Sequence, residues 1–95
     1  MITALKSMPY AQACVRTYDD GTMVLQSYTT DVIYIENDWM NVRGLYSATT
    51  RRHIGAFMKE VNAKYGTDLC YHNAKACYLG NYELNLVTGE IRECL

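Results

Sequence analysis

The sequence is poor in the residues that mark specialised classes of protein. It has one proline, one tryptophan, one phenylalanine and two histidines, and its net charge is −1 over 95 residues. A strongly basic, histone-like nucleic-acid binder is excluded, because such proteins carry a large excess of positive charge. No run approaches the roughly 18 consecutive apolar residues of a membrane span, so we expect no membrane segment. The start, MITALK, also lacks the charged and apolar regions of a secretory signal.

The remaining composition is typical of a small globular protein. Hydrophobic residues make up 49% of the chain and charged residues 20%, a balance that disfavours disorder. The length predicts a single domain over residues 1–95 with a modest core. A core of this size has little room for a deep substrate cavity, so we expect the protein to work through its surface.

The four cysteines match no common metal or redox motif. Cys14, Cys70, Cys77 and Cys94 include no C-x-x-C pair. We expect free thiols in a reducing compartment, with Cys14 and Cys94 acting as small buried hydrophobic residues. The alternative is a zinc site built from Cys70, His72 and Cys77, although this spacing fits no common zinc finger. We therefore predict neither a metal nor another cofactor.

The first half of the chain has the alternating pattern of β-strands. The pair Asp20-Gly21 supplies the positive φ that a tight hairpin turn requires, and it separates the first two runs. Consecutive strands joined in this way form an antiparallel meander. The runs are residues 10–18, 23–28, 31–36 and, as a shorter fourth strand, 41–46.

A helical period follows the strands. We predict a helix over residues 50–65, capped by Thr49 or Thr50 and ended by Gly66 in a left-handed conformation. The apolar stripe of this helix needs a sheet face to cover. The stripe is Ile54, Phe57, Met58, Val61 and Tyr65.

The last third of the chain predicts a second hairpin. Residues 73–79 fit either a short helix closed by Gly80 or a strand that starts near Leu69. Residues 82–87 alternate, and Thr88-Gly89 then turns the chain into residues 90–94. The predicted fold is α+β: a small antiparallel sheet, made of the meander and the C-terminal hairpin, covered by one main amphipathic helix. The hairpin's core candidates are Leu84, Leu86 and Ile91.

The acidic and basic residues are segregated along the chain. Residues 17–42 hold five acidic residues and no lysine or arginine, whereas residues 43–66 hold five basic residues and one acid. The two blocks either neutralise each other within the fold or leave one face free for a charged partner. The acidic, tyrosine-rich segment is our predicted partner-binding face, and the alternative is that its tyrosines are half-buried strand residues. The residues of this face are Asp19, Asp20, Tyr28, Asp31, Tyr34, Glu36 and Asp38.

The predicted helix begins with positive charge, which is unusual. The helix dipole favours acidic residues at this end, yet Arg51, Arg52 and His53 occupy it. A bound anion would explain the arrangement, because helix N-termini and arginines both bind phosphates and carboxylates. The alternative is pairing with the acidic strands. The predicted anion- or nucleic-acid-binding residues are Arg43, Thr49, Thr50, Arg51, Arg52 and His53.

Two motifs resemble a known family. Ser27-Tyr28-Thr29-Thr30 matches a serine-tyrosine-x-threonine strand, and Tyr46 to His53 matches a tyrosine-serine-x-threonine-threonine-x-x-histidine helix start. Residues 23–58 are in this respect similar to a family of short bacteriophage, prophage and mobile-element proteins without an assigned activity. The resemblance implies a phage-type accessory protein in the bacterial cytoplasm. Small proteins in that setting often inhibit host systems, CRISPR nucleases among them.

These features favour binding over catalysis. No nucleophile elbow, P-loop or zinc-binding helix is present, so we do not expect an enzyme. The leading prediction is a phage-type inhibitor that binds a host protein such as a defence nuclease, for example an anti-CRISPR protein blocking a Cas nuclease. The alternative is an accessory protein that binds nucleic acid or another anion through the basic helix start. Self-association through a tyrosine-rich strand edge also stays open.

Overall fold

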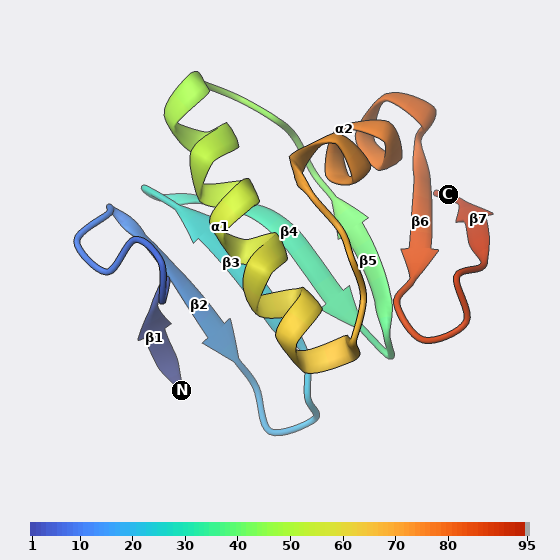
Figure 1. Cartoon of the computed structure of the whole chain (residues 1–95), viewed down its shortest axis with the longest axis horizontal. Coiled ribbons are helices and arrows are strands. Elements are labelled where there is room, and N and C mark those ends of the chain that lie inside the picture. Colours follow the sequence, from blue (N-terminus) through green and yellow to red (C-terminus); the bar gives the residue numbers. More distant parts are fainter. Residues whose placement is uncertain (95) are drawn as a thin grey trace.

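One antiparallel sheet and two helices form the molecule (Figure 1). The structure is a computed structural model and describes residues 1–94. Seven strands lie in the sheet in sequence order, and both helices are inserted between the fifth and sixth strands, on the same face. The predicted α+β class is confirmed. The elements are β1 (Ile2–Ala4), β2 (Ala13–Thr17), β3 (Met23–Ser27), β4 (Thr30–Glu36), β5 (Trp39–Val42), α1 (Ala48–Tyr65), α2 (Tyr71–Gly80), β6 (Tyr82–Asn85) and β7 (Ile91–Glu93).

The core lies between the helices and the inner face of the sheet. The predicted stripe of α1 is confirmed, since Ile54, Phe57, Met58 and Val61 are fully buried. They pack against inward-facing strand residues, and α2 continues this layer over β5 and β6. Both helices lie in front of the sheet in Figure 1, which leaves the other face open. The inward strand residues include Val15, Leu25, Ile33, Ile35 and Met40.

A β-bulge in β4 shapes both faces of the sheet. The register between β3 and β4 shifts after the pair Leu25 and Ile33, so that Gln26 faces Asp31. As a result, both Val32 and Ile33 are buried, although neighbouring strand residues normally point to opposite faces. The bulge also leaves Asp31 within hydrogen-bond reach of Tyr34, whose hydroxyl donates to it at 2.9 Å.

The first hairpin forms as predicted, but the strand lengths differ. Gly21 has φ 90°, and the N–H of Tyr18 donates to the carbonyl of Thr22 at 2.9 Å to close the turn. The run predicted over 10–18 is too long, because only Ala13–Thr17 pairs with its neighbours. The run predicted over 41–46 is displaced, because β5 begins at Trp39 and ends at Val42. Strand β1 was not predicted. It has only three residues, all of them exposed, so it is too short to show the alternation of apolar and polar residues that marks a half-buried strand.

The ends of α1 confirm one predicted cap and correct the other. Gly66 has φ 71° and ends the helix, as predicted. The N-cap, however, is Ser47, whose Oγ accepts from the N–H of Thr50 at 3.2 Å. Neither Thr49 nor Thr50 is the cap, because the helix already begins at Ala48 and the side chain of Thr50 turns into the core.

The C-terminal third contains a helix followed by the predicted hairpin. Of the two interpretations of residues 73–79, the helix is correct, and Asn81 with φ 53° ends it instead of Gly80. Leu86 is buried and Leu84 packs at the edge of the core. Ile91 was wrongly assigned to the core: it is 62% exposed, because it belongs to the outermost strand, beyond the strands that α2 covers.

Candidate functional site

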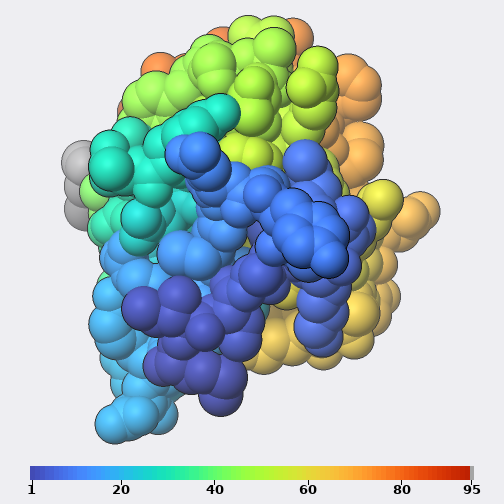
Figure 2. Space-filling view, turned by 90° about the vertical axis from the view of Figure 1, so that its left-hand side faces the viewer, coloured from blue at the N-terminus to red at the C-terminus, as the bar shows by residue number. Residues whose placement is uncertain are grey.

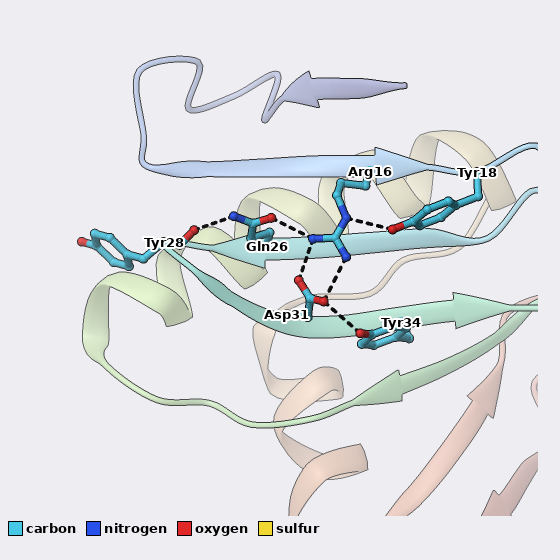
Figure 3. Close-up of polar contacts among 6 residues, drawn as sticks. All are labelled: Arg16, Tyr18, Gln26, Tyr28, Asp31 and Tyr34. Carbon is cyan, nitrogen blue, oxygen red and sulfur yellow. Dashed lines mark hydrogen bonds and ion pairs between the residues drawn. The ribbon is translucent and has the colours of Figure 1, made fainter.

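The open face of the sheet carries a polar network centred on Arg16 (Figure 3). The guanidinium donates from both Nη atoms to the carboxylate of Asp31, at 2.7 and 2.9 Å. It also donates to Gln26 Oε1 at 2.7 Å and to the hydroxyl of Tyr18 at 3.0 Å. The hydrogen bonds from Arg16 and Tyr34 hold the pKa of Asp31 below its usual value. Three adjacent strands, β2, β3 and β4, are thereby linked across their outer surface.

The hydrogen bonds of Arg16 show that part of the acidic segment, residues 17–42, is neutralised within the chain. Arg16 lies one residue before that segment, and the antiparallel register places its side chain beside Asp31. Asp31 therefore belongs to a two-bond ion pair within the chain, and its charge is not free for a partner. The same hydrogen-bonded carboxylate raises the pKa of the Tyr34 hydroxyl, which keeps that hydroxyl a donor.

Tyr34 is also covered by an arginine that directly follows β5. The Cζ of Arg43 lies 4.2 Å from the centroid of the Tyr34 ring, a cation–π contact. The Nε of Arg43 donates to Asn41 Oδ1 at 2.7 Å, which fixes the guanidinium over the ring. The arginine predicted for the anion site thus lies on the open face, on the other side of the sheet from α1.

A second stack lies on the C-terminal hairpin. The Cζ of Arg92 lies 4.0 Å from the centroid of the Trp39 ring, and its Nε donates to Glu83 Oε1 at 2.7 Å. The salt bridge joins β6 to β7, and the stack joins β7 to β5 across the intervening strand. Two arginines therefore hold two aromatic rings on one continuous surface.

These side chains line an open-face cleft of about 810 Å³. Its lining includes three carboxylates and two guanidiniums, so its charge is mixed and slightly negative. Tyr34, Glu36 and Arg43 were predicted as site residues, whereas the other members were missed. Trp39 and Asn41 alternate with buried Met40 and Val42, and this alternation is the signal that could have placed them on the outer face. The lining is Tyr34, Glu36, Asn37, Trp39, Asn41, Arg43, Glu83, Arg92, Glu93 and Cys94.

The predicted acidic, tyrosine-rich face is divided among three places. Asp19 and Asp20 lie in the β2–β3 turn and Asp38 lies in the β4–β5 turn, at the end of the sheet where Glu36 ends β4. Asp31 and Tyr34 lie on the open face. Tyr28, which is 48% exposed, occupies the β3–β4 turn at the opposite end, and its ring lies 5.8 Å from that of His53.

The predicted anion site is corrected at two of its residues. Thr50 and His53 are 4% and 1% exposed, so neither can contact a ligand in solvent. The Oγ of Ser27 lies 2.8 Å from His53 Nδ1 and 3.1 Å from Thr50 Oγ1, and Thr50 Oγ1 lies 3.2 Å from Ser47 Oγ. Burial lowers the pKa of His53, which favours its neutral form. This buried polar cluster attaches the start of α1 to β3.

The remaining residues of that site stay at the surface. Thr49 is half-buried, and Arg51 and Arg52 are exposed on the first turn of α1. Within residues 1–94 neither arginine forms an ion pair, so the expected pairing with the acidic strands does not occur there. Their positive charge is left facing solvent.

The cysteines are free thiols, as predicted. Cys14 and Cys94 are only half-buried, so their assignment to the core was wrong, and Asn41 Nδ2 donates to Cys94 Sγ at 3.2 Å. Cys77 is the buried cysteine, and burial raises its pKa to about 11. Cys70 is exposed at the start of α2, and over residues 1–94 no group of three potential metal ligands gathers.

The fold and the cleft define a small α+β protein with one uncovered sheet face. Residues 1–73 match the family of unknown function DUF8033, and the chain belongs to that family. No curated protein and no solved structure matches the chain. The matched region includes β1 to β5, α1 and the start of α2, so the Arg92 wall of the cleft lies beyond it. In the part of the chain that is described, no helix has the length and apolar character needed to span a bilayer.

Proposed function

We propose that the chain is a protein-binding module that engages its partner through the open-face cleft. The observation that carries this proposal is the pair of arginine–aromatic stacks, Arg43 on Tyr34 and Arg92 on Trp39, on a sheet face without a covering layer. Tyrosine, tryptophan and arginine are the residues enriched at the energetic centres of protein interfaces. Because hydrogen bonds already hold these side chains, little conformational freedom is lost on binding.

The charge of the cleft favours a protein over a nucleic acid. Three carboxylates and two guanidiniums line it, and such a slightly negative surface gives no net attraction for phosphates. Single-stranded nucleic acids also need ring faces for base stacking. One face of each ring is already covered by a guanidinium. A protein partner with charges of both signs fits this surface better.

Inhibition of a host protein is the specific form of binding that we propose. The resemblance to mobile-element proteins supports it, and it suggests a defence nuclease as target and the bacterial cytoplasm as location. The exposed carboxylates of Asp19, Asp20, Glu36 and Asp38, at one end of the sheet, would suit the basic groove of a nuclease. Nucleic-acid binding by the start of α1 is the weaker proposal, because Thr50 and His53 are buried.

Capture of partners from bacterial lysate, with and without nuclease treatment, tests this function. The informative variant is Glu36→Lys, which reverses a charge in the cleft. Glu90→Lys is the matched control. Glu90 is exposed in the β6–β7 turn and does not line the cleft, and its substitution changes the net charge by the same amount. We expect a nuclease-resistant protein that is lost with Glu36→Lys and kept with Glu90→Lys. Equal capture by both variants, or capture that nuclease abolishes, would contradict the proposal.

A further inference from the structure

A second cleft, the helix-side cleft, lies on the opposite side of the sheet. Its volume is about 480 Å³, and it runs over the outer surface of α1. Figure 2 shows the N-terminal segment lying against α1, where the N–H of Lys6 donates to Glu60 Oε2 at 3.0 Å. The start of α2 forms the other wall. The lining residues are Ser7, Met8, Arg52, Gly55, Ala56, Lys59, Leu69, Cys70 and Tyr71.

The helix-side cleft carries unpaired positive charge. Arg52 and Lys59 are seven residues apart on the same face of α1, a separation of about 10 Å along the axis. No aspartate or glutamate lines the cleft, and within residues 1–94 neither cation forms an ion pair. The neighbouring carboxylate, Glu60, is engaged by a backbone N–H. Two separated anionic groups would complement this arrangement.

Gly55 is a second and independent indication of a ligand. It lies between the two cations in the interior of α1, where glycine is less favourable than alanine. A Cβ added at Gly55 would meet no atom within 4 Å, so packing within the chain does not require glycine there. The missing side chain keeps the floor of the cleft low. A floor of Gly55 and Ala56 allows the backbone of another molecule to approach the helix closely.

The walls of the cleft are partly apolar. Met8 and Leu69 border it, and both are only partly buried. Tyr71 also lines it, and its hydroxyl is the one buried side-chain polar atom without a hydrogen-bond partner in residues 1–94. Buried polar atoms normally have partners. This hydroxyl is shielded from solvent, so the surface that the wall offers to a ligand is the apolar one of Met8 and Leu69.

We propose that the helix-side cleft binds an acidic, partly apolar peptide segment of a protein partner. Arg52 and Lys59 pair with two carboxylates, the peptide backbone crosses Gly55, and apolar side chains contact Met8 and Leu69. The site is separate from the open-face cleft and does not depend on it. The chain then has two binding surfaces on opposite sides of one sheet.

NMR titration of the ¹⁵N-labelled full chain with defined probes tests this proposal. The probe is the peptide acetyl-Glu-Leu-Glu-Leu-Glu-amide, its control has glutamine in place of glutamate, and a single-stranded oligodeoxynucleotide is the third arm. We expect the acidic peptide alone to shift the amides of Gly55, Ala56 and Lys59. Saturable shifts from the neutral peptide, or shifts at this site from the oligonucleotide alone, would overturn the proposal, as would no response to the acidic peptide.

Charge-reversal variants sharpen the test. Arg52→Glu with Lys59→Glu should weaken peptide binding by about tenfold or more, because two charge-assisted contacts are lost. Lys64→Glu with Lys75→Glu changes the net charge equally but leaves the lining intact, so it should bind within about twofold of the natural chain. Gly55→Leu should block binding by filling the floor. Equal weakening by both double variants would mean that peptide binding depends only on net charge, and it would overturn the site. Glu36→Lys, in the open-face cleft, should leave peptide binding to the helix-side cleft unchanged.

Discussion

The two clefts differ in how their charges are satisfied. On the open face, arginines are held by carboxylates, amides and aromatic rings of the same chain, as in the bond of 2.7 Å between Arg92 and Glu83. In the helix-side cleft, Arg52 and Lys59 have no ion-pair partner within residues 1–94. The open face is thus preorganised by its own contacts, whereas the two cations of the helix-side cleft are free to pair with acidic groups of another molecule. Substitutions of paired and of unpaired groups should therefore differ in their effect on the free energy of unfolding.

The polar cluster beneath the start of α1 gives the largest expected effect. His53→Ala removes a buried ring and leaves the hydroxyl of Ser27 without one of its partners, so we expect a loss of about 2–3 kcal/mol in the free energy of unfolding. Urea unfolding measures it. The exposed neighbour Arg52→Ala is the control, and its effect should stay within about 0.5 kcal/mol. Similar losses for both would contradict a structural role for His53.

The same histidine makes stability depend on pH. Burial lowers the pKa of His53 in the folded state below the value of about 6.5 that it has in the unfolded chain. The unfolded state therefore binds the proton first, and the stabilisation is complete above about pH 6.5 and is lost as pH falls towards the folded pKa. Unfolding of the natural chain at pH 7.5 and 5.5 should show this loss, and His53→Ala should lack it. An equal pH dependence in the variant would assign the effect to other groups.

Arg16→Ala tests the paired charges of the open face. The variant removes four hydrogen bonds and leaves Asp31 partly buried without its cation. We expect a loss of about 1–2 kcal/mol, since both side chains retain some exposure that weakens the pair. A double-mutant cycle with Asp31→Asn isolates the coupling. A coupling near zero would mean that the bidentate geometry contributes nothing to stability.

Gly55→Ala should have the opposite sign and the smallest size. Its Cβ meets open space in the helix interior, so alanine should stabilise the chain by about 0.5–1 kcal/mol. Thermal unfolding measures the gain, and Ala63→Gly, at an exposed position of the same helix, is the reciprocal control. A destabilised Gly55→Ala would show that glycine is needed by the fold itself, and it would remove the main reason to connect Gly55 with a ligand.

Local patterns predicted most of the fold, and long-range pairing explains what they missed. The stripe of α1 and the Gly66 cap depend on neighbouring residues, so the sequence was sufficient for them. Thr50 was predicted as a cap because the local sequence does not reveal that it is buried. It is buried against Ser27, which lies 23 residues away on β3. Asp31 looked like a free acid because Arg16 reaches it only through the strand register. The bulge at Val32, which no local motif marks, sets that register.

The candidate site was harder to predict than the fold. Tyr34, Glu36 and Arg43 were identified by residue type, but the reasons given for them placed them on two separate surfaces. The structure brings them together with Trp39 and Arg92. These two residues are more than 50 positions apart in the chain, and no sequence motif connects them. Self-association was predicted through a tyrosine-rich strand edge, and this is wrong, because the edge strands β1 and β7 contain no tyrosine. Inhibition and the bacterial host stay predictions.

Site-specific photo-crosslinking in bacterial lysate tests the central claim most directly. A benzophenone amino acid replaces Glu93 in the open-face cleft or, as a control, Leu79, which is 66% exposed and lines neither cleft. We predict that the probe at position 93 crosslinks one nuclease-resistant protein and that the probe at position 79 does not. Crosslinks to nucleic acid at position 93, or the same proteins at both positions, would contradict an open-face cleft built to bind a protein.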